Sequence, residues 1–169
     1  RILTPEDGVA SPMIGIYECS NVRIEGISMG KPAHDALAVA NCVNVTLNGV
    51  TFGSSPESGD VAAGIGSCRG VIVENCSFGN IRDAVLLTSC ADNPGSTEDI
   101  IVRNCQYDGT AYGIRIMDAW SGSYAKNIFV EQCTFSVDSL YSPIAVEHTL
   151  CTTGDLVNIY VRDLSVDKC

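Results

Sequence analysis

The segment RGVIVENCSF (69–78) returns along the chain as EDIIVRNCQY (98–107) and KNIFVEQCTF (126–135). In each copy, an apolar-x-apolar triplet is followed by two polar residues and a second apolar-x-apolar triplet. Alternation with a period of two residues predicts a strand with one buried face, and the polar pair predicts a tight bend. The same pattern recurs in three further segments, SNVRIEGISM (20–29), VNVTLNGVTF (43–52) and VNIYVRDLSV (157–166).

A short apolar stretch precedes each of these segments and is predicted to be a third strand. The six stretches are residues 14–18, 37–40, 63–67, 85–89, 114–118 and 144–148. Three strands in every repeat of 23 to 31 residues predict a solenoid, in which each coil buries its apolar face against the next coil. We therefore expect an all-β fold, a right-handed parallel β-helix of about six coils. A sandwich or barrel is the competing all-β fold, and it would join antiparallel strands through hairpins.

Residue types also repeat in columns, as stacked coils require. The two cysteine columns are Cys19, Cys42 and Cys68, and Cys76, Cys105 and Cys133. We expect these six thiols to be small buried residues, and we expect Cys90, Cys151 and Cys169 to be the better disulfide candidates. A zinc site is not expected, because the sequence has no Cys-x-x-Cys pair. An aromatic column and a turn column are formed by Phe52, Phe78, Tyr107 and Phe135, and by Asn21, Asn44, Asp99, Asn127 and Asn158.

The composition fits one acidic domain with a substantial core. The chain has 169 residues and a formal net charge of -10, and 46% of its residues are hydrophobic. We expect residues 1–169 to be a single β-helix domain that belongs to a longer protein. The acidic balance argues against nucleic acid and anionic membrane surfaces as partners, and no apolar run approaches the roughly 20 residues of a membrane helix. No cofactor or metal is expected.

Polar residues gather where the third strands begin. On successive coils these positions read His34-Asp35, Asp60-Val61, Arg82-Asp83 and Ala111-Tyr112. The stacking places Asp35, Asp60 and Asp83 on one face, where neighbouring carboxylates raise each other's pKa as acid–base catalysis needs. The three aspartates are equally consistent with solvated turn residues. Arg115 is expected to point outward from the strand that follows.

This series resembles the polygalacturonase-like glycoside hydrolases of family 28, which are pectin-degrading β-helices. That family shows Asn-Thr-Asp, Gly-Asp-Asp, Gly-His-Gly and Arg-Ile-Lys, where this chain has Ala33-His34-Asp35, Gly59-Asp60-Val61, Arg82-Asp83-Ala84 and Arg115-Ile116-Met117. The resemblance implies inverting hydrolysis of an extended polysaccharide, with Asp60 as general acid and Asp35 as the base that activates water. It also implies that Arg115 pairs with a uronate carboxylate, and that the protein is secreted or displayed at the cell surface.

The catalytic set is incomplete by comparison with that family. Val61 stands in place of a carboxylate, Asp83 in place of the histidine and Met117 in place of the lysine. A shifted register, with Arg82-Asp83 as the paired-aspartate site and Tyr112-Gly113 as the histidine site, matches equally few groups and loses Arg115.

Two functions therefore stay open. The first is a polygalacturonase-like hydrolase that uses Asp35, Asp60 and Asp83 as catalytic residues. The second is a non-catalytic structural or adhesive β-helix, such as a tail-spike segment, that binds glycan without cleaving it. Trp120 lies in a Ser/Gly loop and is either a sugar-stacking platform or a cap on the core. The candidate sugar contacts are His34, Arg82, Tyr112, Arg115 and Trp120.

One outward column is apolar where water is expected. It consists of Ile72, Ile101, Phe129 and Tyr160, and these residues are called the apolar stripe below. Exposed stripes of this kind mark interfaces. We expect a sister chain, or a segment outside this sequence, to cover the stripe.

Overall fold

The architecture comes from a computed structural model of the chain. The structure describes residues 13–30, 35–53, 61–88, 96–118, 124–136, 142–148 and 155–167. Strands joined by short turns make up these segments. Within them, no helix is long and apolar enough to cross a membrane.

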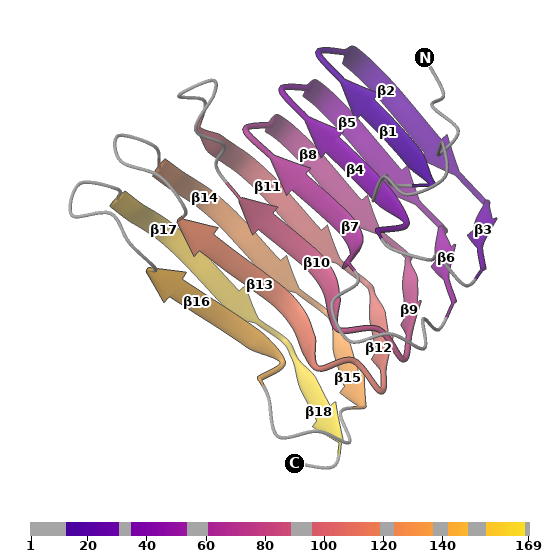
Figure 1. Ribbon diagram of the computed structural model, residues 1–169. Helices are drawn as coiled ribbons and strands as arrows, with labels where there is room; N and C mark the ends of the chain where they lie inside the picture. The colour runs from indigo at the N-terminus through magenta and orange to yellow at the C-terminus, as the bar shows by residue number, and fades with distance from the viewer. Residues whose placement is uncertain are drawn as a thin grey trace.

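Three parallel sheets run along the molecule and enclose one core (Figure 1). The first sheet contains β1 (Ile14–Tyr17), β4 (Leu37–Ala40), β7 (Val61–Gly66), β10 (Asp83–Thr88), β13 (Tyr112–Asp118) and β16 (Ile144–His148). The second sheet contains β2 (Ser20–Glu25), β5 (Val43–Asn48), β8 (Arg69–Glu74), β11 (Thr97–Arg103), β14 (Tyr124–Glu131) and β17 (Asp155–Arg162). The third sheet contains β3 (Ser28–Met29), β6 (Thr51–Phe52), β9 (Ser77–Gly79), β12 (Gln106–Asp108), β15 (Thr134–Ser136) and β18 (Ser165–Asp167).

Each sheet has six strands, one from each successive coil, and neighbouring strands are parallel. The chain therefore winds as a parallel β-helix, as the repeats predict. The described strands show no antiparallel pairing, which excludes the sandwich and the barrel.

The register stacks like residues on like residues throughout the core. Val71 lies beside Ile100, and Ile100 lies beside Ile128, all three fully buried. The predicted aromatic column is also present as a stack of four rings, Phe52, Phe78, Tyr107 and Phe135. Successive ring centroids in this stack are 4.9, 4.9 and 4.4 Å apart. These distances follow the spacing of about 4.8 Å between neighbouring strands, so the aromatic column confirms the predicted stacking.

The turn column forms a ladder of side-chain hydrogen bonds. Asn44 Nδ2 donates to Asn21 Oδ1 at 3.1 Å, and Asn127 Nδ2 donates to Asp99 Oδ1 at 2.8 Å. These residues have φ between +55° and +58°, a left-handed conformation that Asn and Asp tolerate better than most residues. Gly70 interrupts the ladder, and a Cβ at this position would lie 3.0 Å from Asn44 Oδ1. A glycine therefore fits at this position, where a side chain would crowd the Asn44 amide.

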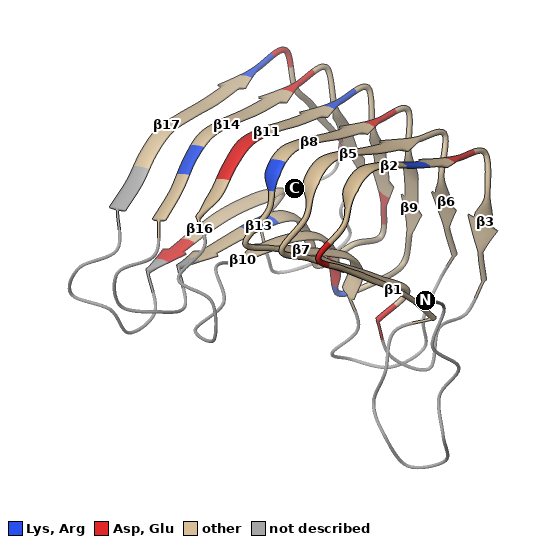
Figure 2. Ribbon diagram, turned by 90° about the horizontal axis from the view of Figure 1, so that it is seen from above, with Lys and Arg blue, Asp and Glu red and all other residues tan. Residues whose placement is uncertain are grey.

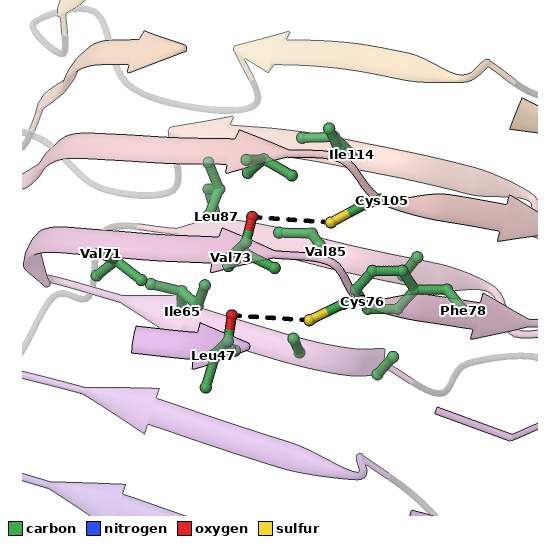
Figure 3. Close-up of a cluster of buried hydrophobic side chains, with 14 of the residues drawn as sticks. Leu47, Ile65, Val71, Val73, Cys76, Phe78, Val85, Leu87, Cys105 and Ile114 are labelled. Carbon is green, nitrogen blue, oxygen red and sulfur yellow. Dashed lines mark hydrogen bonds between the residues drawn. The ribbon is translucent and has the colours of Figure 1, made fainter. Parts of the chain in front are cut away.

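The cysteine columns form buried ladders, with one exception. The thiol of Cys76 donates to the Leu47 carbonyl and the thiol of Cys105 donates to the Val73 carbonyl, each on the preceding coil (Figure 3). The six cysteines of the two columns are free, and five of them are buried. The prediction is wrong for Cys19, which is exposed because it lies on the first coil of the described chain. The disulfide candidates Cys90, Cys151 and Cys169 lie outside the described residues.

Acidic and basic residues alternate from strand to strand near the ends of the strands of the second sheet (Figure 2), and the apolar stripe lies two residues before this charge ladder in each strand. Arg103 is paired with Glu74 at 2.7 Å, and Arg162 is paired with Glu131. In the apolar stripe, Phe129 is 39% and Tyr160 is 51% exposed, and their rings stack with centroids 4.9 Å apart. Ile72 and Ile101 are half-buried. The exposed part of the stripe thus lies on the last two coils.

We expect Tyr107→Phe to raise the free energy of unfolding. Tyr107 Oη is buried and has no hydrogen-bond partner among the described residues. An unsatisfied buried hydroxyl costs about 1 kcal/mol or more, and phenylalanine keeps the ring in the stack. Urea unfolding measures the change, and Phe78→Ala is the opposite control, with an expected loss of about 3–5 kcal/mol. A lower stability for Tyr107→Phe would show that the hydroxyl has a partner.

Candidate functional site on the first sheet

The strands of the first sheet begin with the polar column that the sequence predicts. Asp83 pairs with Val61 on one side and with Tyr112 on the other. Val61 N in turn donates a hydrogen bond to Asp35 Oδ1 at 3.1 Å. Asp35, Val61, Asp83 and Tyr112 therefore follow one another on four successive coils of the same sheet.

Asp83 is a buried carboxylate between two guanidinium groups. Its side chain is 4% exposed, and Asp83 Oδ2 lies 3.5 Å from Arg115 Nη1 and 3.8 Å from Arg82 Nε. Burial raises the pKa of Asp83 above its ordinary value of 3.8, and the charges of Arg115 and Arg82 offset only part of that effect. Asp83 Oδ1 is buried and has no hydrogen-bond partner within the described part of the chain.

Arg115 is the centre of the site. Its Nη2 donates to Glu147 Oε2 at 2.7 Å, and its guanidinium carbon lies 4.7 Å from the centroid of the Tyr112 ring. The Arg115 side chain is 14% exposed, and its Nε is buried without a partner among the residues described. The hydrogen bond to Glu147 raises the pKa of Arg115 above its usual value, so this side chain stays charged.

The outward positions of the first sheet change character along the molecule. The column that contains Arg115 begins with Gly15, Ala38 and Gly64, and then continues with Leu86. A Cβ added at Gly64 would meet only ordinary van der Waals contacts, none nearer than 3.7 Å. The column thus holds small residues on the first three coils, where the Tyr17 ring lies over Gly15, and a charged residue on a later coil.

The structure brings together five of the residues considered for this site. Asp35, Asp83, Arg82, Tyr112 and Arg115 lie on neighbouring coils of the first sheet, as predicted, although their roles remain predictions. His34, Asp60 and Trp120 lie outside the described residues. Among the described side chains, no group of three His, Cys, Asp or Glu residues could hold a metal ion.

Glu147 belongs to the site and is missed by the sequence analysis. The predicted strand at 144–148 contains it, and Ala145 pairs with Arg115 in the register. Glu147 is two residues beyond Ala145 and therefore points to the same side of the sheet. The two-residue alternation along this strand is the sequence feature that could have identified Glu147.

These features define a parallel β-helix whose first sheet carries a row of acidic and basic side chains. A family model described as "Right handed beta helix region" matches residues 7–152, and the chain belongs to that family. The match establishes the right-handed sense of the predicted β-helix.

Two known proteins extend the resemblance. The chain is 24% identical over 156 residues to a probable polygalacturonase of Arabidopsis thaliana, an alignment that covers 76% of this chain and 34% of the relative. The chain thus spans about a third of the length of that curated relative. The crystal structure of endo-xylogalacturonan hydrolase from Aspergillus tubingensis superposes with a TM-score of 0.56 at 13% identity, over 92% of this chain and 62% of the hydrolase. This structural likeness shows the fold, and with the sequence match it confirms the resemblance to polygalacturonases.

We expect Asp83→Asn to change how stability depends on pH. A carboxyl whose pKa is raised in the folded state favours folding less as pH rises from about 3.8, because the folded protein must then ionise a buried group. Asparagine removes this penalty, so the variant should gain stability relative to the wild type between pH 4 and 7. Urea unfolding across this range measures the difference, with the exposed Asp108→Asn as control. A difference that shrinks with rising pH would mean that the Arg115 pairing outweighs burial.

Proposed function

We propose that this chain is the catalytic part of a polygalacturonase-like glycoside hydrolase that cleaves an extended pectic polysaccharide along its first sheet. The observation that supports the proposal most is the polar column at the start of the first sheet, in which Asp83 is ion-paired with Arg115 and Asp35 lies two coils before Asp83. The sequence match to a polygalacturonase supports the same class of substrate. We expect the protein to be secreted, because such a polymer is extracellular.

The proposed reaction is a single displacement at the anomeric carbon. Asp60 donates a proton to the glycosidic oxygen, and Asp35 takes a proton from the attacking water, so that the configuration inverts. The bond from the anomeric carbon to the leaving oxygen breaks as the bond to water forms. Asp60 directly precedes Val61 in the chain, and Val61 N already holds the Asp35 carboxylate, which supports a shared site for these two acids.

Asp83 has a positioning role in this proposal. Its side chain is almost fully buried and lies against Arg115, so it orients the guanidinium and does not itself reach the sugar. Arg115 and Tyr112 then contact the glycan. His34, Arg82 and Trp120 are the further contacts that we propose.

Separate variants test these roles. We expect Asp60→Asn and Asp35→Asn each to lower kcat by about 100-fold or more, because each removes a proton-transfer group. Asp83→Asn should raise KM more than it lowers kcat. Release of reducing ends from polygalacturonate and xylogalacturonan measures all three, and Asp108→Asn, an exposed change on the third sheet, is the control.

The wild-type protein decides between the two functions left open by the sequence. Cleavage that survives in both Asp60→Asn and Asp35→Asn would overturn the assignment of acid and base. Glycan binding without any cleavage by the wild type would indicate the non-catalytic β-helix instead.

The apolar stripe is a separate proposal about partners. Phe129 and Tyr160 present a stacked pair of exposed rings, and we expect a second copy of the chain to bury them. Phe129→Asp should then reduce the size of the particle in light scattering while leaving glycan cleavage in place. Unchanged size and unchanged melting temperature would remove the idea, and Thr134→Asp, an exposed position on the third sheet, controls for the added charge.

A further inference from the structure

We infer that Glu147 makes the site at Arg115 select an uncharged saccharide unit over one with a free carboxylate. A neutral sugar and a methyl-esterified uronate both satisfy this requirement. The inference rests on the proposed function in one respect, namely that a glycan lies along the first sheet. It departs from the expectation that Arg115 pairs with a uronate.

The first argument is charge balance. The positive charge of Arg115 is already matched by Glu147 at 2.7 Å and by Asp83 at 3.5 Å. Both contacts are in a mostly buried setting, where charges are screened less than at the surface. A third carboxylate at this guanidinium would meet two negative neighbours. Arg82 adds a positive charge near the same oxygen of Asp83, but its side chain is 44% exposed and is accordingly screened by water.

The second argument is the supply of hydrogen-bonding atoms. Asp83 Oδ1 and Arg115 Nε are both buried without a partner among the described residues. One atom accepts a hydrogen bond when Asp83 is ionised, and the other atom donates one. Both atoms are closed to solvent, so a bound glycan does not reach them. Arg115 Nη2 is engaged by Glu147 and Nε is buried, so this edge of the guanidinium is not free for the paired contact that a carboxylate makes with arginine.

The third argument concerns the residues around Glu147. Met117 pairs with Glu147 on the neighbouring strand and brings no positive charge. The outward positions on the early coils, Gly15, Ala38 and Gly64, are also uncharged. Among the described residues of this face, the negative charge of Glu147 is therefore compensated by Arg115 alone, and no second cation lies beside it that could hold a uronate.

The test compares binding of two matched probes by calorimetry. The probes are oligogalacturonates of one length, either with free carboxylates or fully methyl-esterified. We expect the wild type to bind the ester at least tenfold more tightly, and this preference should shrink at high ionic strength. Glu147→Gln removes one negative charge at nearly constant shape, so we expect it to shift the ratio of affinities at least tenfold toward the free acid. Glu131→Gln breaks an equivalent pair on the second sheet and should leave the ratio unchanged.

Three outcomes of the binding experiment overturn the inference. They are a wild type that prefers the free acid, a ratio that stays the same in Glu147→Gln while its circular dichroism matches the wild type, and no binding of either probe. The salt dependence in the wild type keeps the test valid should the variant misfold. Failure of the proposed function gives another result. In that case the protein would still prefer the ester in the binding experiment, but it would release no reducing ends. Rapid cleavage of fully de-esterified polygalacturonate would uphold the proposed function and overturn this inference.

Discussion

The regular stacking of parallel strands is the constraint on which the whole structure depends. Each residue has as its nearest neighbours the equivalent residues one coil before and one coil after it, at about 4.8 Å. In a column that keeps one kind of residue, each side chain packs against copies of its own kind, and only some kinds do this well. Flat rings stack, as Phe78 on Tyr107 shows, amides hydrogen-bond to amides, as Asn44 to Asn21 does, and charges must alternate, as Arg103 and Glu74 do.

The same constraint divides each coil into inward positions, where the residue type is restricted, and outward positions, where it can vary. Most inward positions hold apolar residues of similar size. A side chain that is too small would leave a cavity against both neighbouring coils, and one that is too large would clash with both. Outward positions on the first sheet carry no such restriction, and they range from Gly64 to Leu86 and Arg115 in one column. Outward residues can therefore differ from coil to coil on a fixed scaffold, so the fold alone does not define an activity.

Much of the fold could be predicted from the sequence because stacking leaves a periodic trace. The strands, the aromatic column and the left-handed turn positions all recur at the repeat spacing. The exposure of Cys19 could not be read from this trace, because its column is inward and only its place on the first described coil leaves it uncovered. Of the site, the polar column was predictable by register. Glu147 was not singled out, because its contact with Arg115 joins different columns of adjacent coils, and a search along columns does not find diagonal partners.

The two kinds of ion pair in the molecule differ in what they contribute. On the second sheet, Arg162 is largely exposed beside Glu131, and such surface pairs contribute at most about 1 kcal/mol. The group of Asp83, Arg115 and Glu147 on the first sheet is mostly buried, where desolvation offsets the attraction and apolar residues of similar size would stabilise the fold as well or better. The raised pKa of Asp83 shows that this offset is unfavourable for its carboxylate. Stability alone therefore does not account for the buried group, which agrees with the proposal that it recognises a polar ligand at the first sheet.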